Sequence, residues 1–234
     1  MTDDNDDDLR WCVLLPAYQE GGRIGDTVKA AQPFCSDVVV VDDGSSDGTA
    51  AEAEAAGAIV VPHERNMGKG VALKTGFQHV MQAGYDCVVT MDGDGQHAPE
   101  DLPGFLEAYR RSGARVVVGN RMADPKTMPL VRRLTNRFMS GLLSRRMGQH
   151  VPDTQNGYRL YGREVLPILL ATVSEGFAAE SEVLLDLSEA GESIASAPTR
   201  IIYGDECSKI RPVRDTITFF SMLKHHKGNK GATT

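Results

Sequence analysis

The sequence predicts an α/β fold in which a mostly parallel β-sheet carries helices on both faces. Short, uninterrupted apolar segments alternate along the chain with longer segments of helical spacing, a pattern typical of parallel sheets buried on both faces. Polar clusters follow the first four apolar segments, and ligands of such sheets bind beyond the carboxyl ends of the strands. With 234 residues, of which 41% are hydrophobic, the chain can form one domain with a complete core.

Five strands are expected in the first half of the chain, because the apolar segments there are short and bounded by turn residues. These segments cover residues 11–16, 37–43, 58–62, 86–92 and 114–119. Helical spacing predicts helices over residues 22–32, 48–56, 69–83 and 99–112. A helix near residues 130–147 and a late strand within residues 193–203 complete the expected elements.

The two ends of the chain differ from this pattern. Five aspartates lie in the first eight residues, so residues 1–9 are expected to form a disordered acidic tail. Residues 10–212 are expected to form the folded domain, and residues 213–234 an amphipathic, basic tail. No apolar run approaches a membrane span of about 20 residues, and no signal peptide is recognisable. The four cysteines are scattered, which gives no zinc signal and favours a reducing, cytoplasmic location.

Basic residues are concentrated in one region, although the whole chain has a net charge of −7. Residues 110–147 contain ten basic residues and one acidic residue, which favours an anionic partner. Four apolar residues of this region share one helical stripe: Val131, Leu134, Phe138 and Leu142. The stripe is consistent either with core packing or with a basic amphipathic helix that lies in a membrane interface.

Two carboxylates and an amide follow the fourth expected strand: Asp92, Asp94 and Gln96. Their hard oxygen atoms suit Mg²⁺ or Mn²⁺, ions that in turn bridge phosphates. Because aspartates also form ordinary turns at strand ends, this triplet alone does not distinguish a metal site from a turn.

Three further polar clusters follow the other early strands. In "VDDGSSDGT", Gly44 permits a tight turn and Ser46 or Asp47 can cap the next helix, while an aspartate at the strand end can receive a nucleotide. The segment "PAYQE" (residues 16–20) is compatible with a simple strand-to-loop turn. In "NMGKG", Lys69 lies between two glycines without Walker-loop spacing, so it suits either a diphosphate contact or a helix start.

In this order and spacing, the clusters resemble those of the GT-A glycosyltransferases of the processive and polyprenyl family, and most of all its dolichol-phosphate mannosyltransferase branch. The resemblance covers about residues 11–212 and rests on "PAYQE", "VDDGSSDGT", "NMGKG", "MDGDGQHAPED", "VGNR", "DTQNGYRLY", "FAAESE" and "CSKIR". It implies a Rossmann-like GT-A fold and metal-dependent, inverting transfer of a hexose to a polyprenyl (dolichyl) phosphate. The donor would be a nucleotide sugar of the GDP-mannose or UDP-glucose type.

The resemblance also implies roles for single residues. Asp92 and Asp94, with Gln96 beside them, would hold Mg²⁺ or Mn²⁺ against the donor diphosphate, and Gly93 replaces the alanine common between these aspartates. The nucleotide sugar would contact Pro16, Tyr18, Glu20, Asp43, Lys69, Asp92, Lys209 and Arg211. Asp92, Asp94 and Arg121 would be the catalytic residues. The acceptor phosphate would be held by Arg121, Arg132, Arg133 and Asn136, because guanidinium groups suit bidentate phosphate contacts. Asp153 would organise the site together with Arg159 as its partner.

Several alternatives remain at this level. A phosphate acceptor is already ionised at pH 7 and needs no base, whereas a saccharide hydroxyl would need a carboxylate such as Asp153, Glu180 or Glu182. A non-catalytic sugar-nucleotide-binding protein is the third possibility. The lipid acceptor implies peripheral binding to an anionic membrane surface on the cytoplasmic side, or a separate membrane protein as partner; no nucleic-acid partner is expected.

Overall fold

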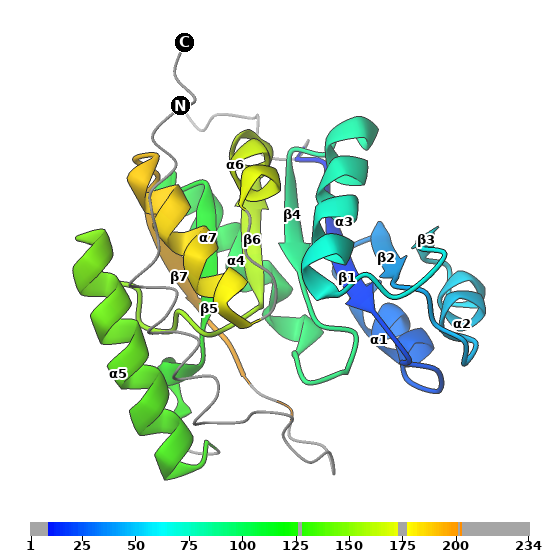
Figure 1. Ribbon diagram of the computed structural model, residues 1–234, viewed down its shortest axis with the longest axis horizontal. Coiled ribbons are helices and arrows are strands. Elements are labelled where there is room, and N and C mark those ends of the chain that lie inside the picture. The colour runs from blue at the N-terminus through cyan, green and yellow to red at the C-terminus, as the bar shows by residue number, and fades with distance from the viewer. Residues whose placement is uncertain (1–8, 126–127, 173–176, 201, 203–234) are drawn as a thin grey trace.

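A computed structural model describes residues 9–125, 128–172, 177–200 and 202. Within this part of the chain, seven strands form one mixed sheet in the order β3-β2-β1-β4-β6-β5-β7 (Figure 1). The strands are β1 (Trp11–Ala17), β2 (Val38–Asp42), β3 (Ile59–Pro62), β4 (Cys87–Thr90), β5 (Val116–Asn120), β6 (Arg159–Gly162) and β7 (Ile194–Pro198). The α/β class with a mostly parallel sheet is therefore confirmed.

The first five helices begin and end close to the residues expected from the sequence. They are α1 (Ile24–Ala31), α2 (Thr49–Ala55), α3 (Lys69–Ala83), α4 (Leu102–Ser112), α5 (Leu130–Met147), α6 (Leu166–Ala171) and α7 (Phe177–Glu189). Glycines in the left-handed conformation follow α3, α4 and α5, at Gly84, Gly113 and Gly148, where a residue without Cβ ends a helix without strain. Helices α6 and α7 were not expected from periodicity.

Strand β6 is the main departure from the expected topology. It lies between β4 and β5 and runs antiparallel to both, so that Tyr161 pairs with Val88 on one side and Val116 on the other. Its sequence, RLYG, has two apolar residues between an arginine and a glycine and lacks the β-branched run that marks the other four-residue strands, so no strand was expected there.

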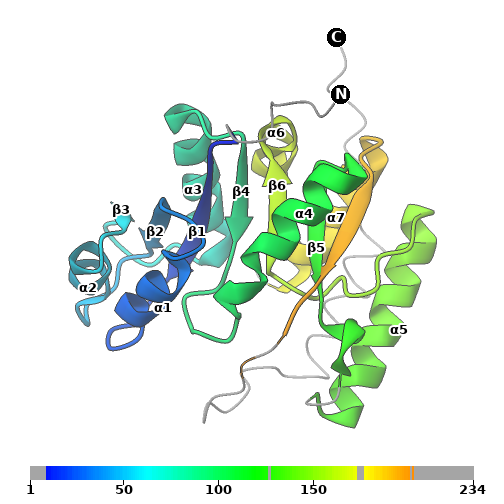
Figure 2. The same cartoon turned by 180° about the vertical axis from the view of Figure 1, so that it is seen from behind.

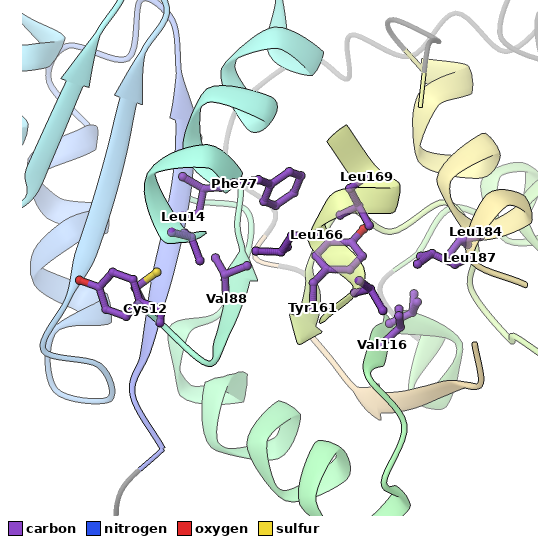
Figure 3. Packing of buried hydrophobic residues seen from close by; sticks show 14 of the residues in the cluster. Cys12, Leu14, Phe77, Val88, Val116, Tyr161, Leu166, Leu169, Leu184 and Leu187 are labelled. Carbon is purple, nitrogen blue, oxygen red and sulfur yellow. The ribbon is translucent and has the colours of Figure 1, made fainter. Parts of the chain in front are cut away.

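Alternate side chains of the strands build two cores, one on each face of the sheet. On one face, residues such as Leu14 and Val88 pack against α3, α5, α6 and α7 (Figure 3). On the other face, residues such as Val13 and Val89 pack against α1, α2 and α4, which lie in front in Figure 2. Coverage of both faces explains why the strands are apolar along their whole length.

Some expectations concern residues outside the described ranges. Lys209 and Arg211 belong to this group, as do residues 1–8 of the acidic tail and the whole of residues 213–234. None of the described helices combines the length and the hydropathy needed to cross a bilayer.

Candidate active site

The carboxyl ends of β1, β2 and β4 meet at one edge of the sheet, because these neighbouring strands are parallel. The polar clusters that follow them enclose a cleft of about 330 Å³, within the size range of small-molecule sites. The cleft is lined by Pro16, Ala17, Tyr18, Glu20, Asp43, Asn66, Lys69, Ala72, Asp92, Gly93 and Asp94. All described residues predicted to contact a nucleotide sugar therefore lie around one cleft.

Side chains of the loop after β2 hold the loop after β1. The backbone N–H of Gln19 donates to Ser45 Oγ at 2.9 Å, and its side-chain amide donates to Ser46 Oγ at 3.0 Å. These bonds fix Gln19 at φ 58°, a left-handed conformation that residues other than glycine rarely adopt. The Glu20 N–H donates to Thr49 Oγ1 at 3.0 Å. The serines and threonine of "DDGSSDGT" thus position Tyr18 and Glu20 at the cleft.

Asp43 organises the loop that leads into α3. Its carboxylate accepts the backbone N–H groups of Met67 and Gly68 at 2.9 and 2.7 Å, and His63 Nδ1 lies 2.7 Å from it. The carboxylate is almost fully buried, so these contacts compensate for the loss of water around the charge. This anchoring function was not anticipated, since the partners of Asp43 lie 20 to 25 positions away along the chain.

An ion-pair cluster lies where α3 begins beside the end of β4. Lys69 Nζ is 2.7 Å from Asp92 Oδ1 and 3.1 Å from Glu180 Oε1, although Glu180 is 111 residues away along the chain. His97 Nε2 lies 3.5 Å from the other oxygen of Asp92, and the His97 ring rests against Tyr158. Lys69 and Asp92 remain partly exposed, which leaves the cluster open to a ligand.

The charges of this cluster reinforce one another. Burial alone would favour neutral Asp92, but Lys69 and His97 hold the pKa of this carboxyl well below its usual range. Burial likewise opposes the charged form of Lys69, yet Asp92 and Glu180 raise its pKa above the ordinary lysine value. Both groups are therefore ionised at neutral pH.

The donor set at the end of β4 fits a hard divalent cation. Asp94 Oδ1 accepts the Gln96 N–H at 3.0 Å, which forms a tight turn that keeps both aspartates beside the cleft. No group of three or more His, Cys, Asp or Glu side chains converges on a metal position among the described residues. Mg²⁺ commonly binds one or two carboxylates and completes its shell with water and substrate phosphates, so two aspartates suffice.

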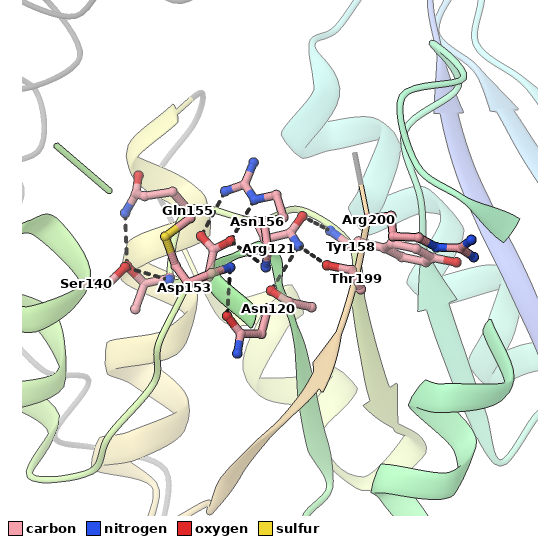
Figure 4. Close-up of polar contacts among 12 residues, drawn as sticks. Asn120, Arg121, Ser140, Asp153, Gln155, Asn156, Tyr158, Thr199 and Arg200 are labelled. Atoms are coloured by element: carbon pink, nitrogen blue, oxygen red, sulfur yellow. Dashed lines mark hydrogen bonds and ion pairs between the residues drawn. The ribbon is translucent and has the colours of Figure 1, made fainter. Parts of the chain in front are cut away.

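Arg121, directly after β5, and Asp153, in the loop before β6, form a buried ion pair (Figure 4). Arg121 donates from Nε and Nη2 to the two carboxylate oxygens at 2.6 and 2.8 Å, and its backbone N–H also donates to Asp153. The expectation that Asp153 pairs with Arg159 is wrong. Arg159 instead donates to the backbone carbonyls of Thr154, Asn156 and Glu180, because β6 turns its side chain towards them.

Further polar residues of "DTQNGYRLY" join the strands around this pair. The Asn156 amide donates to the Gly119 carbonyl at 2.9 Å and to Thr199 Oγ1 at 3.2 Å, which connects β5 with the end of β7. A Cβ at position 119 would lie 2.6 Å from that amide nitrogen, so only glycine fits there. The motif is visible in the sequence, but these contacts depend on how β5 and β7 lie side by side in the sheet.

The other predicted acceptor residues lie on α5. Arg133 lines a cavity of about 360 Å³ between α5 and the loop before Asp153, together with Arg137 and His150. Asn136 faces inward and is buried, and Arg132 lies on α5 outside the lining of this cavity. The structure thus brings together Arg133, Arg137 and His150, two of which were not predicted.

The outer face of α5 is apolar and exposed. Leu130, Val131, Leu134 and Phe138 are each at least 60% exposed. The inner face, with Met139 and Leu143, packs into the core, and Leu142 lies against that core. The predicted stripe is therefore not core packing, except at Leu142.

Comparison with known proteins shows the family. Residues 12–169 match the family described as Glycosyl transferase family 2. The chain belongs to this family. One relative of this transferase is a UDP-N-acetylglucosamine–dolichyl-phosphate N-acetylglucosaminyltransferase of Methanococcus voltae, which is 30% identical over 82% of this chain and 85% of the relative. Another is an undecaprenyl-phosphate mannosyltransferase of Micrococcus luteus, which is 32% identical over 83% of this chain and 84% of the relative.

A solved structure shares the fold of the transferase. Glucosyl-3-phosphoglycerate synthase of Mycobacterium tuberculosis, in complex with Mn²⁺, UDP-glucose and phosphoglyceric acid, is 22% identical with a TM-score of 0.69. The match covers 97% of this chain and 84% of that chain. The GT-A fold expected from the sequence motifs is thereby confirmed.

Proposed function

We propose that the protein transfers a hexose from a nucleotide sugar to a polyprenyl phosphate, with inversion at the anomeric carbon, at the cytoplasmic face of a membrane. The observation that carries this proposal is the cleft with Asp92, Asp94 and Lys69, in a chain similar over most of its length to enzymes named as lipid-phosphate sugar transferases. GDP-mannose and UDP-glucose are the two donors to test first.

The cleft supplies contacts for each part of the donor. Tyr18 is 47% exposed at its rim, where an aromatic ring can lie against a base or ribose. Pro16, Glu20 and Asp43 form the wall on which the nucleoside would rest, and Lys69 would face the diphosphate. Lys209 and Arg211, which lie outside the described residues, are proposed to contact the donor as well.

Asp92 and Asp94, with Gln96 beside them, would hold Mg²⁺ or Mn²⁺. When bound, such an ion neutralises the diphosphate and stabilises it as the leaving group. The complex of the M. tuberculosis enzyme with Mn²⁺ and UDP-glucose supports this choice. Asp92 and Asp94 would also fix the position of the diphosphate relative to Lys69.

Arg121, Arg132, Arg133 and Asn136 would serve the acceptor phosphate. Since the Arg121 side chain is fixed by Asp153, it would present a rigid cation, whereas Arg133 would act from the wall of its cavity beside Arg137 and His150. Arg133→Ala should raise the apparent KM for the lipid phosphate by about tenfold, the loss of one charge-assisted contact. A mutant whose only defect is weaker nucleotide binding in calorimetry would contradict this role.

The exposed outer face of α5 supports contact with a membrane. Leu130, Val131, Leu134 and Phe138 would enter the interface, while arginines of the same helix would meet anionic head groups. If the protein does not bind anionic vesicles at low salt, the acceptor must instead be presented by a separate membrane protein.

A transfer assay tests the proposal directly. The protein is incubated with Mn²⁺, lipid extract and a set of labelled nucleotide sugars, and label is expected in the organic phase. Label in water-soluble saccharide would instead indicate a hydroxyl acceptor, for which Glu180 beside the cleft is the available base. No transfer with any donor, despite nucleotide binding, would indicate a sugar-nucleotide-binding protein without activity.

A further inference from the structure

Lys69 already contacts Asp92, one of the two carboxylates proposed to hold the divalent cation. Its ammonium lies between Asp92 and Glu180, 2.7 and 3.1 Å from their nearest oxygen atoms. The backbone makes room for this contact at Gly157, where a Cβ would lie 3.0 Å from Glu180 Oε1 and 3.5 Å from Lys69 Nζ. The ion pair therefore lies between the start of α3, helix α7 and the loop before β6.

Both oxygens of Asp92 are engaged in this arrangement. Lys69 lies at Oδ1, and His97 Nε2 lies 3.5 Å from Oδ2. A metal ion that approaches Asp92 must therefore compete with a positive charge already in contact with the carboxylate. Lys69 is 44% exposed, so its flexible side chain can leave Asp92 without disturbing the core.

The charges make separate binding of metal or nucleotide unfavourable. A nucleoside diphosphate without a metal would bring its negative charge towards Asp92, Asp94 and Glu180. A metal without a nucleotide would meet the Lys69 ammonium at short range, where like charges repel strongly. When both arrive, the metal can replace Lys69 at Asp92, and Lys69 can turn to the diphosphate.

We propose that Lys69 is a built-in counter-cation that the divalent metal displaces, so that metal and nucleoside diphosphate bind cooperatively. This inference rests on the proposed function, since it assumes that Asp92 ligates the metal. It assigns Lys69 two successive partners, the carboxylates in the free protein and the diphosphate in the complex. Lys69 is thus a positioning residue for the metal as well as a contact for the donor.

Mn²⁺ binding provides a test that does not depend on activity. The concentration of free Mn²⁺ is followed by electron paramagnetic resonance for the wild type and Lys69→Gln, with Mn²⁺ alone and with UDP or GDP. Lys69→Gln should bind Mn²⁺ alone about tenfold more tightly or better, because the competing charge is removed. The gain in Mn²⁺ affinity caused by the nucleotide should be smaller in Lys69→Gln than in the wild type.

Two variants serve as controls. Lys74→Gln removes an ammonium from the same helix that contacts the Thr172 carbonyl, so its affinity for Mn²⁺ alone should equal that of the wild type. Lys69→Arg keeps the positive charge and should keep the weak binding of Mn²⁺ alone. The proposal is overturned if Lys69→Gln binds Mn²⁺ alone no better than the wild type. If the wild type binds no Mn²⁺ even with UDP and GDP, the assignment of Asp92 and Asp94 as metal ligands is wrong. Transfer that continues in the presence of a chelator would show the same independently.

Discussion

The two halves of the sheet edge are built in different ways. Around β1, β2 and β4, the cleft residues follow their own strands directly, and neighbouring loops are joined by short polar side chains such as Ser45 and Thr49. Around β5, β6 and β7, a buried ion pair connects the residue after β5 with the loop before the antiparallel strand β6, as Arg121 binds Asp153. The candidate residues of the first half can therefore be recognised from motifs at strand ends. Those of the second half can be placed only when the order of the strands in the sheet is known.

The largest effect is expected in the first half, at the carboxylates beside the cleft. Asp92→Asn should lower the transfer rate by about a thousandfold or more, since a lost Lewis acid costs several kcal/mol in the transition state. Initial rates with saturating donor and Mn²⁺ measure this effect. Asp86→Asn is the control at the opposite end of β4, where Asp86 accepts the Arg10 N–H, and transfer should be nearly unchanged. Near-normal, Mn²⁺-dependent transfer by Asp92→Asn would remove Asp92 from the metal site.

In the second half, a large effect on stability is expected. Asp153→Ala leaves the buried Arg121 without its carboxylate partner and should lower the free energy of unfolding by about 3–5 kcal/mol. Urea-induced unfolding measures the change. The control is Glu107→Ala, which breaks an exposed pair with Arg111 and should cost less than about 1 kcal/mol. Equal, small losses of unfolding free energy in both variants would show that the Arg121–Asp153 pair does not stabilise the part of the sheet around β5, β6 and β7.

A moderate effect is expected for membrane binding through α5. Arg145→Glu with Arg146→Glu should weaken binding to anionic vesicles about tenfold or more, because each basic residue near such a surface contributes about 1 kcal/mol. Binding should also decrease as salt is added. Arg110→Glu with Arg111→Glu is the matched control, since these residues lie on α4 at the opposite face of the sheet. Vesicle sedimentation that is equally reduced by both pairs would indicate unspecific attraction.

The smallest effect is expected at Gly93, between the two aspartates. A Cβ there would lie 3.3 Å from Ile24 Cδ1 and 3.4 Å from the Pro16 carbonyl, so a small shift of neighbours accommodates it. Gly93→Ala should therefore change the free energy of unfolding by less than about 1 kcal/mol and leave transfer nearly intact. Gly119→Ala, in the second half, should cost about 1–3 kcal/mol, because the added methyl group meets Asn156 at 2.6 Å. Thermal unfolding of both variants tests the contrast.

The sequence predicted the fold class, six of the strands and the polar residues Tyr18, Glu20, Asp43, Lys69, Asp92 and Asp94 of the cleft, because each depends on local periodicity or on a motif at a strand end. It did not predict β6, whose position depends on pairing with two strands that precede it by many residues. The ion-pair partners of Lys69 and Asp153 were not predicted for the same reason. A side chain such as Glu180 carries no sign in the sequence that a lysine 111 positions earlier is its partner.

The placement of β6 has a consequence for the protein during its synthesis. Strands β1 to β4 emerge from the ribosome in an order that lets them pair at once, since each of the parallel pairs joins strands already made. Strand β5 follows, yet its two partners, β6 and β7, lie later in the chain. At about 5–20 residues per second, a nascent chain spends seconds with one side of β4 and both sides of β5 unpaired. Unpaired strand edges are templates for association with other chains, so this interval is the stage at which the growing polypeptide most needs a chaperone.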